Sequence, residues 1–353
     1  MSAASGGESI ENASVQEEKS ATGYSWYVLG VLVVVYILNF IDRQIVSILV
    51  VDIQAHFGLD NAQIGFLGGA AFGVFYALFG IPLGRLADNW NRTRLLSIGL
   101  TLWSAMTVIS GLAKNGAQLG LARMGVGIGE ATASPSAYSL ISDYFPKRQR
   151  ATALAIYSSG LYLGGGVSLF IGASIKESWN LAYPAGGPLG LVGWQAAFLA
   201  VGVPGLLVAL WVLSLREPAR GVMDDTPVAM SPTPFRDFLH DLSTIVPPFT
   251  LIGAARRSMS ALALNLFAAG ALGAFAWLMI GLTGNIPQWS AVAVGFYAVF
   301  SWATNLRARD PATFRLIWGT PAFLCTSLGY GLVALASYGL ALWTAPYAEK
   351  VLK

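Results

Sequence analysis

Two oppositely charged residues, Asp42 and Arg43, lie side by side near the middle of an apolar run that covers residues 26–51. A helix of about 26 residues is long enough to cross the hydrocarbon core of a membrane, which is roughly 30 Å thick. Ionised groups at that depth cost several kcal/mol unless they face a protein interior or a wet cavity. The pair therefore predicts a polar site inside a helical bundle. The alternative is a structural ion pair that fixes helix packing.

The composition also indicates a membrane protein. The chain is 55% hydrophobic and only 11% charged, whereas soluble domains carry about 25% charged residues. A net charge of +3 is too small and too dispersed for a nucleic-acid-binding protein. One cysteine and two distant histidines, His56 and His240, argue against a disulfide framework and a metal site. Without a Ser/His/Asp set or a phosphate-binding loop, we expect neither an enzyme nor a bound cofactor.

Nine apolar stretches are expected to cross the membrane. Residues 1–23 read as a disordered tail, and 24–215 as a bundle of six helices. A polar linker is expected at 216–258, an inserted transmembrane hairpin at 259–305, and an interfacial helix with one more span at 306–353. An odd number of spans predicts that the natural chain continues beyond Lys353. The nine spans cover residues 26–51, 62–82, 95–113, 117–141, 151–175, 192–214, 259–282, 289–305 and 321–343.

Basic residues alternate strictly between the loops of the first six spans. The loops after spans two, four and six carry arginine and lysine, whereas the loops between them carry few or none. Because basic loops stay in the cytoplasm, this alternation predicts a cytoplasmic N-terminus. The residues that carry this signal are Arg85, Arg92, Arg94, Lys147, Arg148, Arg150, Arg216 and Arg220.

A second set of charges lies in span four. Arg123 and Glu130 are seven residues apart, which places them on one helix face about 10 Å apart along the axis, with Gly127 between them. A buried carboxylate near a cation is a plausible proton carrier, because desolvation and charge attraction compete to set its protonation. Asp42 and Glu130 are therefore our candidates for proton binding. The alternative is that Arg123 and Glu130 bind each other only for packing.

Two further motifs have less specific interpretations. Gly84, Asp88 and Arg92 mark the loop after span two. A carboxylate at this place can interact with the positive end of a neighbouring helix dipole. The alternative is that the loop only sets the membrane topology. In span five, Gly160 and Gly164 are four residues apart and favour close helix packing. Pliability during a gating motion is the alternative reading of these glycines.

Taken together, these motifs resemble the major facilitator superfamily. Residues 84–92 are similar to its signature loop between the second and third helices, with Asn91 in place of the usual second glycine. Arg123, Gly127 and Gly129 resemble the fourth-helix motif of proton-coupled members. Residues 39–43, 127–131 and 143–150 look like the bacterial Spinster-like branch, and the resemblance extends over about 24–220. The final apolar run resembles the seventh helix of that branch.

The resemblance implies an all-α polytopic membrane protein with a six-helix N-terminal bundle, two inserted helices and the start of a second bundle. It implies a proton-coupled transporter that works by alternating access, in a bacterial inner membrane, as a monomer. Asp42 and Glu130 would bind the proton, while Arg43, Arg123 and Asn39 would pair with them or hold a substrate headgroup. Gly84, Asp88 and Arg92 would form a gating motif.

The resemblance suggests a lysophospholipid-like amphipathic lipid as the substrate. A polar solute such as a sugar or organic acid is an alternative with the same fold. A non-transporting membrane receptor or scaffold is an alternative from a different class. In each case the bilayer is the surrounding medium, and no nucleic-acid partner is expected.

Overall fold

The computed structural model describes residues 20–224 and 230–351, and every regular element in those ranges is helical. This confirms the expected all-α fold. Most of the predicted N-terminal tail lies outside the described residues. Its last part caps the first helix, because Thr22 Oγ1 accepts a hydrogen bond from Ser25 N at 3.2 Å.

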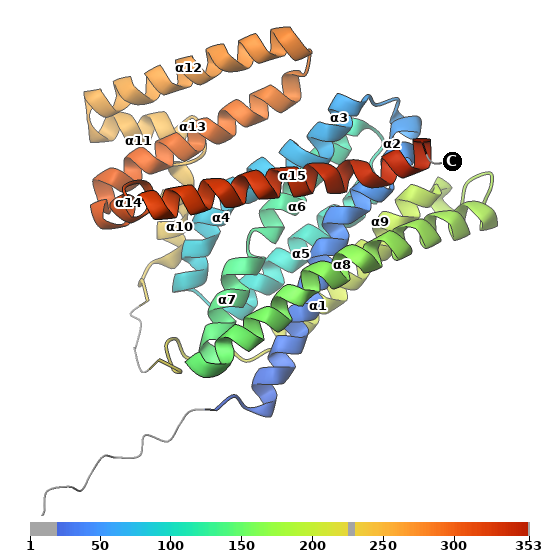
Figure 1. The fold of residues 1–353 in the computed structure, drawn as a ribbon, viewed down its shortest axis with the longest axis horizontal. Helices are drawn as coiled ribbons and strands as arrows, with labels where there is room; N and C mark the ends of the chain where they lie inside the picture. Colours follow the sequence, from blue (N-terminus) through green and yellow to red (C-terminus); the bar gives the residue numbers. More distant parts are fainter. Residues whose placement is uncertain (1–19, 225–229, 352–353) are drawn as a thin grey trace, which may run out of the picture.

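A tilted helical bundle forms the larger part of the molecule (Figure 1). Helix α1 covers most of the first apolar run, and the expected second span begins with a short helix and a π-helical turn, η1, before α4. The bundle consists of α1 (Gly23–Ile48), α2 (Val50–Phe57), α3 (Asn61–Gly65), η1 (Phe66–Ala70), α4 (Ala71–Asn89), α5 (Arg92–Gly111), α6 (Gly116–Glu130), α7 (Ala133–Tyr144), α8 (Lys147–Ala182), the 3₁₀ turn η2 (Pro188–Gly190) and α9 (Gly193–Leu213).

The fourth span is broken, although the sequence predicted one helix over 117–141. Helix α6 ends at Glu130 and α7 begins at Ala133. Pro135 has no N–H to bond with the carbonyl of Ala131 four residues earlier, which weakens the helix at this point. Thr132 N instead bonds to Gly129 O at 3.2 Å, which tightens the turn directly after Glu130.

Small residues let the bundle helices approach one another closely. A Cβ atom at Gly164 of α8 would lie 2.6 Å from Ile37 O of α1, and one at Gly160 would lie 3.2 Å from Tyr36. Gly127 of α6 is equally close to α4, with 2.5 Å to Phe72 O. Because helix backbones can meet only where side chains are absent, these glycines set which helices border the charged residues.

The remaining helices lie against this bundle. Figure 1 shows α12 and α13 as a pair on one side, and α15 running across the bundle, where it touches α1. The helices are α10 (Pro234–Ser243), α11 (Phe249–Arg257), α12 (Met259–Thr283), α13 (Ile286–Arg309), α14 (Pro311–Trp318) and α15 (Pro321–Val351). The expected linker thus contains two helices of its own.

The expected count of nine membrane spans is only approximate. Among the described residues, seven helical stretches are long and apolar enough to cross a membrane. Neither half of the broken fourth span reaches that length, and polar side chains such as Gln288 and Ser301 reduce the mean hydropathy of α13. The seven stretches are Gly23–Ile48, Asn61–Asn89, Arg92–Gly111, Lys147–Ala182, Gly193–Leu213, Met259–Thr283 and Pro321–Glu349.

Candidate functional site

Helix α1 carries three of the predicted site residues into the bundle. Asn39, Asp42 and Arg43 fall on one side of the helix because they are spaced by three and four residues. The side chains of Asn39 and Asp42 are almost fully buried, at 1% and 2% exposure. The amide nitrogen of Asn39 has no hydrogen-bond partner, so this part of the site holds an unused donor.

Arg43 pairs with Glu130 of α6. Its Nε donates to Glu130 Oε2 at 2.6 Å, and the side chain of Glu130 is fully buried. The guanidinium also lies over the rings of Phe72 and Tyr76 in α4, 5.0 and 4.7 Å from their centroids. Cation–π contacts of this kind stabilise a desolvated guanidinium. The pair therefore joins α1, α4 and α6.

The other two charges are arranged differently. Asp42 accepts a hydrogen bond from Thr107 Oγ1 of α5 at 2.5 Å. Arg123 is 2% exposed, and its Nε and Nη1 atoms have no hydrogen-bond partner. The sequence left open a packing pair between Arg123 and Glu130, and the structure places Glu130 against Arg43 instead. Arg123 is therefore a buried cation with free donors.

Two adjoining cavities border these charges. The first, of about 490 Å³, is lined by both arginines and by a mixture of polar and apolar side chains, and we call it the polar cavity. The second, of about 580 Å³, is lined mainly by apolar side chains of α1, α8 and α15. Gln44 and Tyr338 line both, so a cavity that contains charged side chains and one that contains none, which we call the apolar cavity, meet at these two residues. The polar cavity also includes Ser47, Asn61 and Gln288, and the apolar one Phe40, Leu161, Leu169 and Val333.

Tyr338 is one of three site residues that the sequence did not reveal. Arg43 Nη1 donates to its hydroxyl at 3.1 Å, which connects α1 to α15 across 295 positions of sequence. Phe72 and Tyr76 were missed as well. Each lies in an apolar run without any charged neighbour, so only the three-dimensional arrangement marks them as part of the site.

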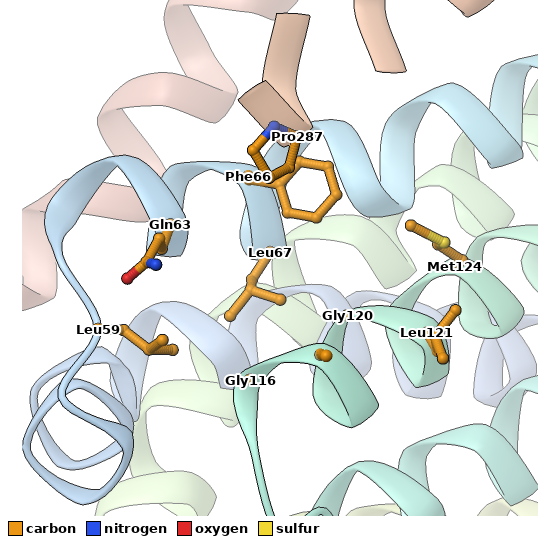
Figure 2. A pocket seen from close by; sticks show the side chains of 10 residues that line it. Leu59, Gln63, Phe66, Leu67, Gly116, Gly120, Leu121, Met124 and Pro287 are labelled. Carbon is orange, nitrogen blue, oxygen red and sulfur yellow. The ribbon is translucent and has the colours of Figure 1, made fainter. Parts of the chain in front are cut away.

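The π-helical turn η1 separates the polar cavity from a third space. Gly68 and Gly69 line the polar cavity, whereas Phe66 and Leu67 line an apolar recess of about 520 Å³. Figure 2 shows this recess between η1 and α6, with Pro287 of α13 at its edge. Its walls include one amide side chain, Gln63, and no charged residue. The recess therefore lacks the groups that would bind a proton or an ion.

The predicted gating residues lie where α4 ends and α5 begins. Arg92 is fully buried, with Nε 2.7 Å from Glu217 Oε1, and it also pairs with Asp143 of α7. Asp88 is exposed and makes no hydrogen bond among the described residues, and Gly84 lies against Pro135. The structure thus brings Arg92 into a buried network and leaves Asp88 at the surface.

Further ion pairs attach the segment after α9 to the same end of the bundle. Arg150 Nη2 donates to Asp224 Oδ2 at 2.8 Å, and this hydrogen bond lowers the pKa of Asp224 below its ordinary value. Arg220 donates to the carbonyl oxygens of Ala87 and Trp90, each at 2.6 Å. Among the described residues, no group of three His, Cys, Asp or Glu side chains is placed to hold a metal ion.

Comparison with known proteins gives a consistent family match. A family model described as Major Facilitator Superfamily matches residues 32–348. The crystal structure of a bacterial homologue of the human lysosomal transporter Spinster, inward-facing and occupied, superposes with a TM-score of 0.58. It is 28% identical, and the superposition covers 92% of this chain and 82% of that one.

Two curated relatives differ in what their names say they carry. The sphingosine-1-phosphate transporter of Xenopus tropicalis is 33% identical over 193 residues, which is 52% of this chain and 37% of that protein. A probable L-galactonate transporter of Escherichia coli (strain K12) is 28% identical over 182 residues, 51% of this chain and 37% of that protein. The matches thus cover less than half the length of these two relatives.

Proposed function

Because this chain belongs to the major facilitator superfamily, we propose that it acts in proton-coupled secondary transport of an amphipathic anion, a lysophospholipid-like lipid. The observation that carries the proposal is the buried pair of Arg43 and Glu130, beside Asp42 and the unpartnered donors of Arg123. Such charges at membrane depth mark ion and substrate pathways. The orientation expected from the basic loops, with a cytoplasmic N-terminus, is part of the same proposal.

Protonation of Glu130 controls whether Arg43 is available. The ionised carboxylate holds the guanidinium at 2.6 Å. A proton on Glu130 removes the attraction and frees Arg43 to bind an anionic headgroup together with Arg123. Asp42, held by Thr107, is the second proton site. Loss of the pair also loosens α1 from α6, which lets the helices move during alternating access.

The two adjoining cavities favour a lipid over a small polar solute. A headgroup would occupy the polar cavity near Arg43 and Arg123, and an acyl chain would extend past Gln44 and Tyr338 into the apolar one. A substrate that is polar throughout would meet no charged side chain in the apolar cavity. The lipid named for one relative agrees with this amphipathic arrangement.

A sugar acid is the second candidate, because one relative is named as a probable L-galactonate transporter. The amide and hydroxyl groups of Gln44, Ser47, Asn61 and Gln288 in the polar cavity could bind its hydroxyls. Competition binding separates the candidates. A lysophospholipid should displace a fluorescent lysophospholipid probe, whereas displacement by L-galactonate alone would favour the sugar acid.

The proposal is tested by transport in vesicles. The protein in its longest natural form is reconstituted, a pH gradient is imposed, and movement of a fluorescent lysophospholipid is followed. Asp42→Asn and Glu130→Gln should abolish the response to the gradient. Glu177→Gln, the same change at an exposed carboxylate, should preserve it. If both buried variants respond to the gradient as the parent does, the proton assignment is wrong.

A further inference from the structure

Five arginines gather at one end of the hairpin formed by α12 and α13. Helix α11 ends in Arg256 and Arg257 immediately before α12 begins. The antiparallel helix α13 returns to the same end and finishes with Arg307 and Arg309 (Figure 1). Arg315 follows in the last turn of α14. We call this set, residues 256, 257, 307, 309 and 315, the basic end of the hairpin.

Most of these charges lack a carboxylate partner. Asp241 of α10 accepts from Arg309 Nη1 at 3.0 Å, but it also binds Arg85 of α4 at 2.8 Å. Asp310 is used to cap α14, where it accepts from the backbone and hydroxyl of Thr313. Among the described residues, no carboxylate pairs with the other four arginines of the basic end. The surface therefore carries an uncompensated positive charge.

Exposed apolar side chains lie directly beside these cations. On α11, Phe249 and Ile252 are 53% and 45% exposed, on the helix face that also leads to Arg256. On α14, Leu316 and Trp318 are exposed at the end that carries Arg315. Short helices with one exposed apolar face and terminal arginines lie at the headgroup level of a membrane, and tryptophan favours the same depth.

Arg257 adds an unfilled donor to the basic end. Its Nε is buried and has no hydrogen-bond partner. Burial lowers the pKa of its side chain, and no neighbouring carboxylate opposes that effect. Because this atom is enclosed by protein, the donors that an anionic oxygen from outside the chain reaches directly are those of the exposed Arg256, Arg307 and Arg315.

We propose that the basic end of the hairpin binds the phosphate headgroup of an anionic phospholipid in the adjacent leaflet. Clusters of four or more basic residues beside a membrane helix attract anionic lipids, and here the cations stand next to apolar side chains that can reach the acyl region. The alternative is that the arginines only balance the C-terminal dipoles of α11, α13 and α14. That role needs no lipid and predicts no preference between anionic and zwitterionic headgroups.

A bound lipid would act on more than the hairpin itself. Asp241 joins Arg309 of the basic end to Arg85 near the end of α4. At the opposite end of the hairpin, Asn285 Nδ2 donates to Ala62 O at 3.2 Å. Since the hairpin is attached to the α3–η1–α4 segment at both ends, a headgroup on the basic end also anchors the end of α4 that carries Arg85.

Lipid binding is measured on the 353-residue chain in a mild detergent by native mass spectrometry. Phosphatidylglycerol and phosphatidylcholine with identical acyl chains are the two probes. The parent should retain phosphatidylglycerol in preference to phosphatidylcholine. The quadruple variant Arg256→Gln, Arg257→Gln, Arg307→Gln, Arg315→Gln should bind phosphatidylglycerol more weakly, by up to about a thousandfold, with its phosphatidylcholine binding unchanged.

A matched control removes charges elsewhere. Arg94→Gln with Lys147→Gln changes two exposed bases at the predicted cytoplasmic end of the bundle and should bind phosphatidylglycerol as the parent does. Circular dichroism checks that each variant is folded, and the pairs 256/257 and 307/315 are measured separately in case the quadruple variant does not fold. Each pair should weaken binding by up to about thirtyfold. Parent-like phosphatidylglycerol affinity in the folded quadruple variant, or in both pairs, overturns the proposal, as does a parent that prefers neither lipid.

Discussion

The six-helix bundle and the helices that follow it differ most in how far their apolar stretches are buried in protein. In the bundle, 22% to 56% of the most apolar part of each spanning helix is buried, against 6% for α12 and none for α15. The mean hydropathy of α12 and α15 lies within the range of the bundle helices. Hydropathy therefore predicts where a helix spans and leaves open what it packs against.

The difference shows which forces attach each region. Lipid is as apolar as a leucine side chain, so apolar area alone does not drive helices together in a membrane. The bundle helices meet through glycines and through the buried network of Arg92. The later helices are attached at a few polar points, of which Tyr338, Asp241 and Asn285 are the clearest. A single substitution should therefore reduce the unfolding free energy more in the bundle than in the later helices.

The largest effect is expected at Arg92. Its guanidinium is fully buried and binds Asp143, Glu217 and the carbonyl of Pro218. Arg92→Ala removes the cation that pairs with the buried Asp143 and the partly buried Glu217, which keep only backbone N–H donors, and this costs about 3–5 kcal/mol of unfolding free energy. Unfolding by a denaturing detergent measures the loss. Arg94→Ala, the exposed arginine two residues later, is the control and should change the midpoint little.

Equal midpoints for the two arginine variants would contradict this comparison. They would mean that the ion pairs of Arg92 stabilise the bundle no more than an exposed arginine does. The buried attachment between α5, α7 and the segment after α9 would then not distinguish the bundle from the later helices.

A smaller loss is expected where α8 meets α1. A Cβ atom at Gly164 would lie 2.8 Å from Phe40 Cβ, whereas one at Gly166, half a turn further on, meets nothing within 4 Å. Gly164→Val should therefore reduce the unfolding free energy by about 1–3 kcal/mol through overpacking. Gly166→Val should not destabilise. The same unfolding assay compares the two variants. An equal loss of unfolding free energy at both positions would show that the close contact at Gly164 does not stabilise the packing of α8 against α1.

The sequence allowed the fold to be predicted better than the site. Apolar run lengths and the motif at residues 84–92 led to the all-α fold and to the family, and both are confirmed. The break between α6 and α7 was missed, although Pro135 was visible. Helix periodicity reports which residues share a face of one helix, so it correctly put Arg123 and Glu130 on one side of the fourth span.

Periodicity does not report which other helix lies opposite that face. Arg43 and Glu130 are 87 positions apart, and Arg43 and Tyr338 are 295 apart. Their meeting depends on close approach at glycines such as Gly127, which is decided by packing across several helices at once. The roles of Asp42 and Glu130 as proton carriers stay predictions, because protonation during transport is a property of the working cycle.

The smallest effect is expected at Tyr338, the polar contact between α15 and the charged site. Tyr338→Phe removes the acceptor for Arg43 Nη1 and keeps the ring, and hydrogen bonds between membrane helices contribute about 0.6 kcal/mol on average. Cys325 is the only cysteine of the chain and is exposed on α15, so a spin label there reports the motion of that helix. The variant should increase the mobile fraction of the label without changing the unfolding midpoint of the bundle.

Tyr347→Phe, which removes an exposed hydroxyl from the same helix, is the control and should leave the spectrum of the label unchanged. If both variants give the parent spectrum, apolar contacts alone hold α15 against α1, and the two regions differ less than their buried fractions indicate.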